Sequence, residues 1–173
     1  MAGLDIETAK YLAEKSKEWI DRQLNTYREK RSVASTIIGL NTLFVPFFLG
    51  GIADSLFWIK IVAIVPILII SVALIYLISI YYLKRLEQGL APEKYQDAIN
   101  KSYGDAILFE IAVNRDSIHS NTPILERVNK AYRIGINLTQ IAIVLSIIVL
   151  SLNMFFRPNS ETIKIEISKP KKK

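Results

Sequence analysis

The 173-residue chain contains no cysteine and a single histidine. The absence of cysteine excludes disulfide bonds, thiol catalysis and cysteine-ligated zinc, and one histidine leaves no basis for a multi-histidine metal site. The sequence also lacks a phosphate-binding glycine loop, a serine nucleophile elbow and a catalytic pair of carboxylates. We therefore predict that the protein is not an enzyme and binds no metal or cofactor.

Charge is missing from residues 32–53, 61–83 and 134–156, which contain no Asp, Glu, Lys, Arg or His. Each run is near or above the roughly 20 residues that span about 30 Å of hydrocarbon as a helix. These runs predict an all-α protein with three transmembrane helices in a lipid bilayer. The first run follows 31 mostly polar residues, so we expect no cleaved secretory signal.

The apolar runs divide the chain into five segments. We predict an amphipathic cytosolic helix in 1–31, a transmembrane hairpin in 32–83 and a small cytosolic helical segment in 84–133. A third transmembrane helix in 134–156 and a basic tail in 157–173 complete the chain.

The N-terminal segment has apolar residues at three- and four-residue steps after Asp5, a plausible N-cap. This face is expected to pack on the protein's own cytosolic helices or on a neighbouring subunit, or alternatively to lie flat on the membrane. With no glycine or proline after Gly3, the helix can run directly into the first membrane helix. The face consists of Ile6, Ala9, Leu12, Ser16, Trp19, Ile20, Leu24 and Tyr27.

Helix-breaking proline and glycine residues divide the segment 84–133 into three predicted helices. Pro92 is a suitable first helical residue for a helix over 93–103, and Gly104 precedes a second helix that ends at His119. Thr122 and Pro123 predict the start of a third helix, which continues into the last membrane run.

Small or mildly polar residues form a stripe on the first and third membrane helices, whereas the second helix is apolar all round and is expected outside them, against lipid. The stripes would allow close helix packing or line a narrow wet path, and they would face each other or meet a second subunit. The first stripe is Ser32, Ser35, Gly39, Thr42, Pro46, Gly50 and Ala53, with Asn41 to one side. The second stripe is Gly135, Thr139, Ala142, Ser146, Val149 and Asn153.

Positive charge predicts the orientation of the chain in a plasma (inner) membrane. Seven Lys or Arg residues precede the first run and eight lie in 84–133, so both segments are expected in the cytoplasm. Three crossings then place the basic tail outside, unless the third run is buried or re-entrant. Most of the net charge of +6 is in this tail, which suits anionic lipid headgroups better than a specific nucleic acid.

The tail also contains the one alternating pattern in the sequence. Ile163, Ile165 and Ile167 alternate with polar residues, which predicts a short strand or a disordered tail. A lone strand would pair with a second copy, and this favours a homo-oligomer.

Arg115 and His119 lie four residues apart, so a helix would bring them to one face. An arginine and a histidine in that arrangement can steady a phosphate and move a proton. The pair resembles the motif of HEPN ribonucleases, which has four to six intervening residues where this chain has three. A solvated polar face is the alternative interpretation.

The layout of an amphipathic helix, a two-helix hairpin and further cytosolic helices, with Trp19, Tyr27, Arg28 and Arg31, resembles the SLATT-type prokaryotic membrane proteins over residues 5–130. That resemblance implies a membrane-disrupting effector of antiphage or conflict systems, triggered by a cytosolic partner or signal. The third membrane run and the tail depart from the family pattern.

Three functions are thus expected from the sequence. The first is a homo-oligomeric pore gated by a cytosolic partner. The second is a non-conducting membrane anchor that recruits a soluble partner, and the third is a membrane-tethered HEPN-like ribonuclease. The absence of ionisable residues from the membrane runs argues against charge-carrying transporters and is compatible with a poorly selective pore that closes by dewetting.

Overall fold

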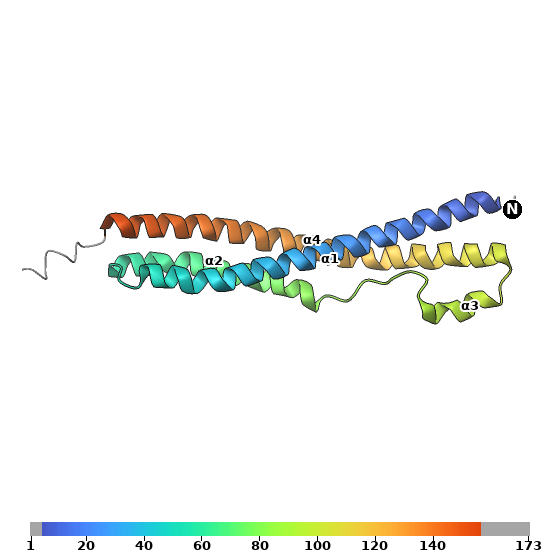
Figure 1. Ribbon diagram of the computed structural model, residues 1–173, viewed down its shortest axis with the longest axis horizontal. Coiled ribbons are helices and arrows are strands. Elements are labelled where there is room, and N and C mark those ends of the chain that lie inside the picture. The colour runs from blue at the N-terminus through green and yellow to red at the C-terminus, as the bar shows by residue number, and fades with distance from the viewer. Residues whose placement is uncertain (1–4, 157–173) are drawn as a thin grey trace, which may run out of the picture.

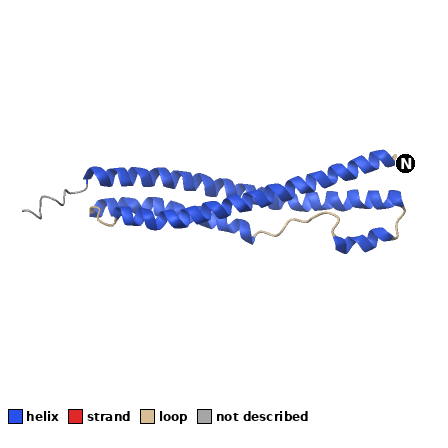
Figure 2. Ribbon diagram, in the orientation of Figure 1, coloured by secondary structure: helices blue, strands red, loops and turns tan. Residues whose placement is uncertain are grey.

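A computed structural model describes residues 5–156 of the chain. It contains three long helices, α1 (Ile6–Ile52), α2 (Phe57–Tyr82) and α4 (Tyr103–Phe156). A short 3-10 turn, η1 (Pro92–Lys94), leads into a one-turn helix, α3 (Tyr95–Ile99). Figure 2 shows that the described residues form helices and loops without a strand.

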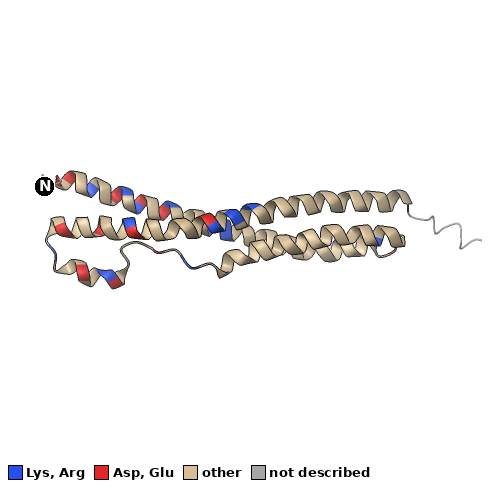
Figure 3. Cartoon of the chain, turned by 180° about the vertical axis from the view of Figure 1, so that it is seen from behind, with Lys and Arg blue, Asp and Glu red and all other residues tan. Residues whose placement is uncertain are grey.

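The long helices lie side by side in a rod with two different halves (Figure 1). The apolar half, residues 32–83 and 134–156, contains all of α2 and the C-terminal parts of α1 and α4. The charged half, residues 5–31 and 84–133, contains the N-terminal parts of α1 and α4 with the loop and α3 beside them. Figure 3 shows that Lys, Arg, Asp and Glu gather in the charged half, apart from a few at the α1–α2 turn.

Helix α1 runs unbroken from the charged half into the apolar half, as the sequence predicts. Asp5 occupies the N-cap position without a side-chain capping bond, and its backbone oxygen accepts from the N–H of Ala9. Pro46 lies inside the helix without ending it. At about 1.5 Å per residue, the 22 uncharged residues 32–53 rise by about 33 Å, which matches the hydrocarbon thickness of a bilayer.

Helix α4 is longer than predicted, because it continues through Thr122 and Pro123. The expected helix start at these residues is therefore wrong. The Thr122 hydroxyl donates to the backbone oxygen of Ile118 at 2.8 Å instead of capping a new helix. Pro123 removes one helical hydrogen bond, to His119, but both residues are exposed, so water can satisfy the freed carbonyl.

The predicted helix over 93–103 is also wrong in extent. Only η1 and the five residues of α3 are helical, although Pro92 does occupy the first helical turn as predicted. Ser102 then starts α4, since its hydroxyl accepts from the Asp105 N–H at 3.3 Å and donates to the Asp105 carboxylate at 2.6 Å. These two bonds cap the start of α4.

Helix α2 does not sit outside the other two helices as expected. It packs along α4 and contacts α1, and residues at three- and four-residue steps are buried on one face. Ala63 and Ala73 on this face are small enough for close approach. Because α2 is apolar on every side, no contrast between an apolar and a polar face marks the buried side, and therefore the sequence pattern could not predict it.

The predicted strand and basic tail, 157–173, lie outside the described residues. Three helices, α1, α2 and α4, are long and apolar enough to cross a membrane.

Candidate functional site: the two stripes and the boundary between the halves

The stripe of α4 lies inside the bundle. All six of its residues are buried between α1 and α2, and Ser146 and Ala142 are completely inaccessible. At its centre, the buried side-chain amide of Asn41 on α1 donates to the Thr139 hydroxyl at 3.1 Å. Near the α1–α2 turn, the Asn153 amide donates to the Gly51 backbone oxygen at 3.0 Å. This stripe therefore serves close packing inside one protomer.

Glycine is required in this stripe at Gly135. A Cβ atom at that position would lie 2.6 Å from Cγ of Leu77, a fully buried residue of α2. Because Leu77 has no room to move, the side-chain-free backbone of α4 sets how closely α2 can approach.

The stripe of α1 lies on the outside. Ser35, Gly39, Thr42, Pro46 and Gly50 are all exposed on the surface of the apolar half, as are the flanking stripe residues at both ends. A Cβ atom at position 39 or 50 would meet no neighbouring atom within 4 Å. The expectation that the two stripes face each other within a subunit is therefore wrong. The helix instead buries its opposite face, with Ala34, Asn41, Phe48 and Ile52.

The packed stripe of α4 continues into the charged half, which the sequence pattern did not lead us to expect. Asn114, Ser117, Asn121, Val128 and Ala131 are buried at the same three- and four-residue steps as the membrane part. The signal was present as a row of small and amide residues, but it was hidden by the expected helix break at Thr122.

These buried amides fasten the loop between α2 and η1 to α4. The Asn121 side chain accepts from the Glu87 N–H at 2.7 Å and donates to the Glu87 backbone oxygen at 2.9 Å. Gly89, at a φ of 75°, packs against Asn114, where any side chain would collide. We call residues 83–91 the strap, since they hold α2 to the charged half.

The N-terminal part of α1 packs on α4 with a face slightly different from the predicted one. Ala9, Ile20 and Tyr27 are buried as expected, and Ala9 packs against Ile107. Ile6, Leu12 and Trp19 are exposed instead, although they belong to the predicted face. Ala13 and Gln23 take their places, with the Gln23 amide donating at 3.5 Å to Thr122 and to the Ile118 backbone.

Aromatic and basic side chains form a boundary layer where the two halves meet. The Arg31 guanidinium lies over the rings of Tyr27 and Tyr81, 5.4 and 4.7 Å from their centroids, and the Tyr81 hydroxyl donates to the Arg31 backbone oxygen at 2.6 Å. On the α4 side, the Lys30 ammonium lies 5.3 Å from the Tyr132 ring centroid. Such residues are enriched where a protein leaves the hydrocarbon of a bilayer.

The opposite end of the apolar half has an aromatic pair. The rings of Trp58 on α2 and Phe156 on α4 pack edge to face with centroids 5.6 Å apart. Lys60 follows in the first turn of α2 and is exposed. Two aromatic layers thus bracket the uncharged surface, as at the two faces of a bilayer.

The pair Arg115 and His119 lies on the exposed side of α4. The Arg115 side chain is 79% exposed and forms an ion pair with Asp116 at 3.3 Å. Neither residue lines a described hollow. The arrangement matches the interpretation of a solvated polar face, and the described residues include no group of three or more His, Cys, Asp or Glu that could hold a metal.

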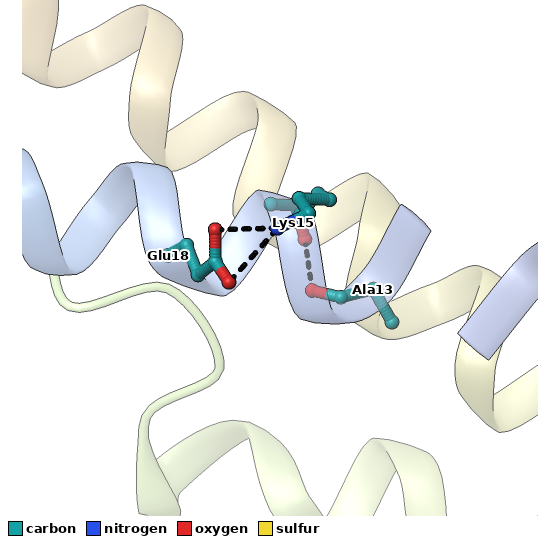
Figure 4. A network of polar contacts seen from close by, with 4 residues as sticks. Ala13, Lys15 and Glu18 are labelled. Atoms are coloured by element: carbon teal, nitrogen blue, oxygen red, sulfur yellow. Dashed lines mark hydrogen bonds and ion pairs between the residues drawn. The ribbon is translucent and has the colours of Figure 1, made fainter. Parts of the chain in front are cut away.

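The pKa values of Lys15 and Glu18 on α1 are displaced. Their side chains bond at 2.9 and 3.0 Å (Figure 4), and this hydrogen bond holds the pKa of Glu18 below its usual value and raises the pKa of Lys15. Both groups are exposed, so the pair is a surface feature remote from the stripes.

These features define an all-helical protein with three helices able to span a membrane and with one packed and one exposed stripe. No protein-family model, curated protein or solved structure shows significant similarity to the chain.

Proposed function

We propose that this protein is a homo-oligomeric component of a prokaryotic inner membrane that opens a pore, or otherwise disrupts the membrane, when a cytosolic partner or signal acts on it. This is the activity of an antiphage or conflict effector, which the SLATT-type layout implies. The observation that carries the proposal is the exposed stripe of α1. Its glycine and hydroxyl residues lie on the outer surface of the apolar half, where small residues allow a helix of another copy to approach closely.

Because the stripe of α4 is packed within one protomer, the stripe of α1 is the one available to line a channel between protomers. Because Thr139 and Ser146 are buried within one protomer, they are not available to line a channel between protomers. Several copies that turn Ser35, Gly39 and Thr42 toward a common axis would instead surround a narrow path of hydroxyl and glycine residues with apolar constrictions. Such a path closes by dewetting and opens after a small rotation of the helices.

Continuous helices support a link between the two halves. Both α1 and α4 cross the boundary layer without a break, so a movement of their charged ends reaches the membrane segments directly. The strap adds a connection from α2 to α4 through Asn121. A partner that binds the charged half can therefore change how the three membrane helices sit.

Expression in bacteria with a membrane-potential dye tests the pore. Gly39→Leu is the decisive variant, since the structure leaves room for the new side chain within the protomer. We expect the wild type to depolarise the cell when its trigger is supplied and Gly39→Leu to lose this effect. Ser71→Leu on the exposed side of α2 is the matched control, with an equally exposed small residue off the stripe.

A non-conducting anchor that recruits a soluble partner is the second candidate, and the eight basic and seven acidic residues of 84–133 favour it. It predicts that Gly39→Leu leaves function intact, whereas charge reversals at exposed residues such as Arg127 and Lys130 abolish recruitment. Ser146→Leu does not discriminate between the candidates, because Ser146 is fully buried and a leucine there would disturb the fold itself. An unchanged membrane potential with and without the trigger would exclude the pore and favour the anchor.

A further inference from the structure

Two hollows adjoin on one side of the interface between α1 and α4. The first, of about 320 Å³, lies at the boundary layer and is lined by Lys30, Asn129, Tyr132, Arg133 and Asn137. The second, of about 410 Å³, lies deeper in the apolar half. Ile136 lines both hollows, so they adjoin, and we call the pair the groove, with the first hollow as its basic mouth and the second as its apolar part.

The mouth of the groove is positively charged and has hydrogen-bond donors without a partner among the described residues. The Lys30 ammonium donates to the Asn129 side-chain oxygen at 2.5 Å and has two further N–H groups. Arg133 has no hydrogen bond or ion pair with any described residue and is exposed. No acidic residue lines this hollow. Arg133 also lines the adjacent hollow, where Glu126 lies with Lys130, but it forms no ion pair with Glu126. Two cations held around one hollow are suited to a phosphate group.

The deeper part of the groove is suited to a hydrocarbon chain. Its walls are mainly apolar, with Leu40 and Phe44 on α1 and Ile136 and Ile143 on α4, and the exposed Gln140 also lines it. The polar groups at its base, Asn41 and Thr139, bond to each other. An apolar occupant therefore gains contact with the walls without leaving this pair of polar groups unmatched.

The order of the two parts along the rod matches one class of molecule. The basic mouth lies at the boundary layer and the apolar part extends into the segment that is long enough to cross a bilayer. A soluble anion would use only the mouth, and a helix from a second copy would use only the apolar part. We propose that this groove binds an anionic phospholipid, with its phosphate between Lys30 and Arg133 and one acyl chain between α1 and α4.

Native mass spectrometry of the full chain in a neutral detergent tests the mouth. We expect phosphatidylglycerol to remain bound at concentrations where phosphatidylcholine with the same acyl chains does not. The double variant Lys30→Gln and Arg133→Gln should weaken phosphatidylglycerol binding by about tenfold or more. Arg28→Gln with Arg127→Gln is the control, because it removes the same charge from exposed residues that do not line either hollow. Equal losses in both double variants would overturn the site.

Filling the groove tests the acyl chain separately. Ile143→Trp should weaken phosphatidylglycerol binding, whereas Ile148→Trp, on the exposed side of α4 away from the groove, should not. Inorganic phosphate in large excess should fail to displace the lipid, and displacement would reduce the site to a simple anion site.

The cysteine-free chain allows a cross-linking test of whether a second copy occupies the groove. Efficient disulfide cross-linking of Leu40→Cys to Ile143→Cys between copies in vesicles would show that a second protomer fills the groove. That result would overturn the proposal.

Discussion

The two halves of the rod are held together by different kinds of contact. In the apolar half, three helices pack through small residues and apolar side chains, with single hydrogen bonds from the side-chain amides of Asn41 and Asn153. In the charged half, two long helices and the strap also pack through apolar side chains, but amide and hydroxyl side chains such as Gln23, Asn114 and Asn121 add hydrogen bonds between them. Water competes for the hydrogen bonds of exposed polar groups, and Gln23, Asn114 and Asn121 are all buried, which favours their contacts within the protein.

The difference between the two halves can be followed along a single helix. Helix α4 keeps a single buried stripe along most of its length. In the charged half the stripe includes the amides Asn114 and Asn121, whereas in the apolar half it consists mainly of small residues. The geometry is constant because the helix period is constant. The chemistry changes because close van der Waals packing takes the place of burial from water as the source of stability in lipid.

The largest effect is expected from a methyl group added in the packed stripe. Gly135→Ala places a Cβ against Leu77 and should destabilise the helix bundle by about 1–3 kcal/mol. Gly39→Ala makes no contact and should be neutral or stabilising by up to about 1 kcal/mol, since alanine favours the helix. Unfolding in mixed micelles, followed by circular dichroism, measures both. Equal effects at the two glycines would contradict the assignment of one stripe to the inside and one to the outside.

An effect of similar size, but confined to local stability, is expected where the strap meets α4. Asn121→Ala leaves the N–H and carbonyl of Glu87 without their partners and should cost about 1–3 kcal/mol of local stability. The strap should then open more often, and trypsin should cleave faster after Lys84 and Arg85. Ser120→Ala, at the exposed neighbouring position, is the control. Unchanged cleavage would mean that the strap is held by its apolar residues alone.

The polar contact inside the apolar half should contribute less. A double-mutant cycle with Asn41→Leu and Thr139→Val should give a coupling of about 0.6 kcal/mol, and at most about 1.7 kcal/mol. The unfolded helices in the membrane find other partners for the same groups, which limits the gain. A coupling energy of zero would show that the two side chains do not interact.

The smallest effect is expected at the exposed pair of Lys15 and Glu18. The pKa of Glu18 is lowered in the folded state by its hydrogen bond from Lys15, so the contribution is present above the ordinary value of 4.5 and is lost as pH falls through the lower folded value. Glu18→Gln should therefore leave unfolding at pH 7 nearly unchanged, because solvent screens the pair. A clear loss of stability at pH 7, absent at pH 3, would contradict this view.

Several parts of the fold were predictable from local patterns. The three apolar runs, the continuity of α1 and the first turn at Pro92 follow from hydropathy, the absence of breakers and proline geometry. The continuation of α4 through Thr122 was not predictable in the same way. Proline disfavours a helix interior in general, but an exposed Pro123 on a helix fixed at both ends by packing is tolerated.

The candidate site was predictable as a set of residues but not as an arrangement. Helical spacing placed Gly39 and Ser146 on stripes, yet spacing alone does not state which stripe meets a neighbour. The groove at Lys30 and Arg133 was not foreseen at all. Its lining comes from two helices about a hundred residues apart in the chain, and no local pattern relates them.

By itself, the sequence determined which segments are helical and uncharged enough to cross a membrane, because helix length and hydropathy depend on neighbouring residues. Only the tertiary structure decided that α4 buries its stripe while α1 exposes one, that Asn121 holds the strap, and that a basic mouth opens into an apolar groove. These outcomes depend on how three helices rotate about their own axes to pack together, and that rotation is set by contacts between residues far apart in the chain.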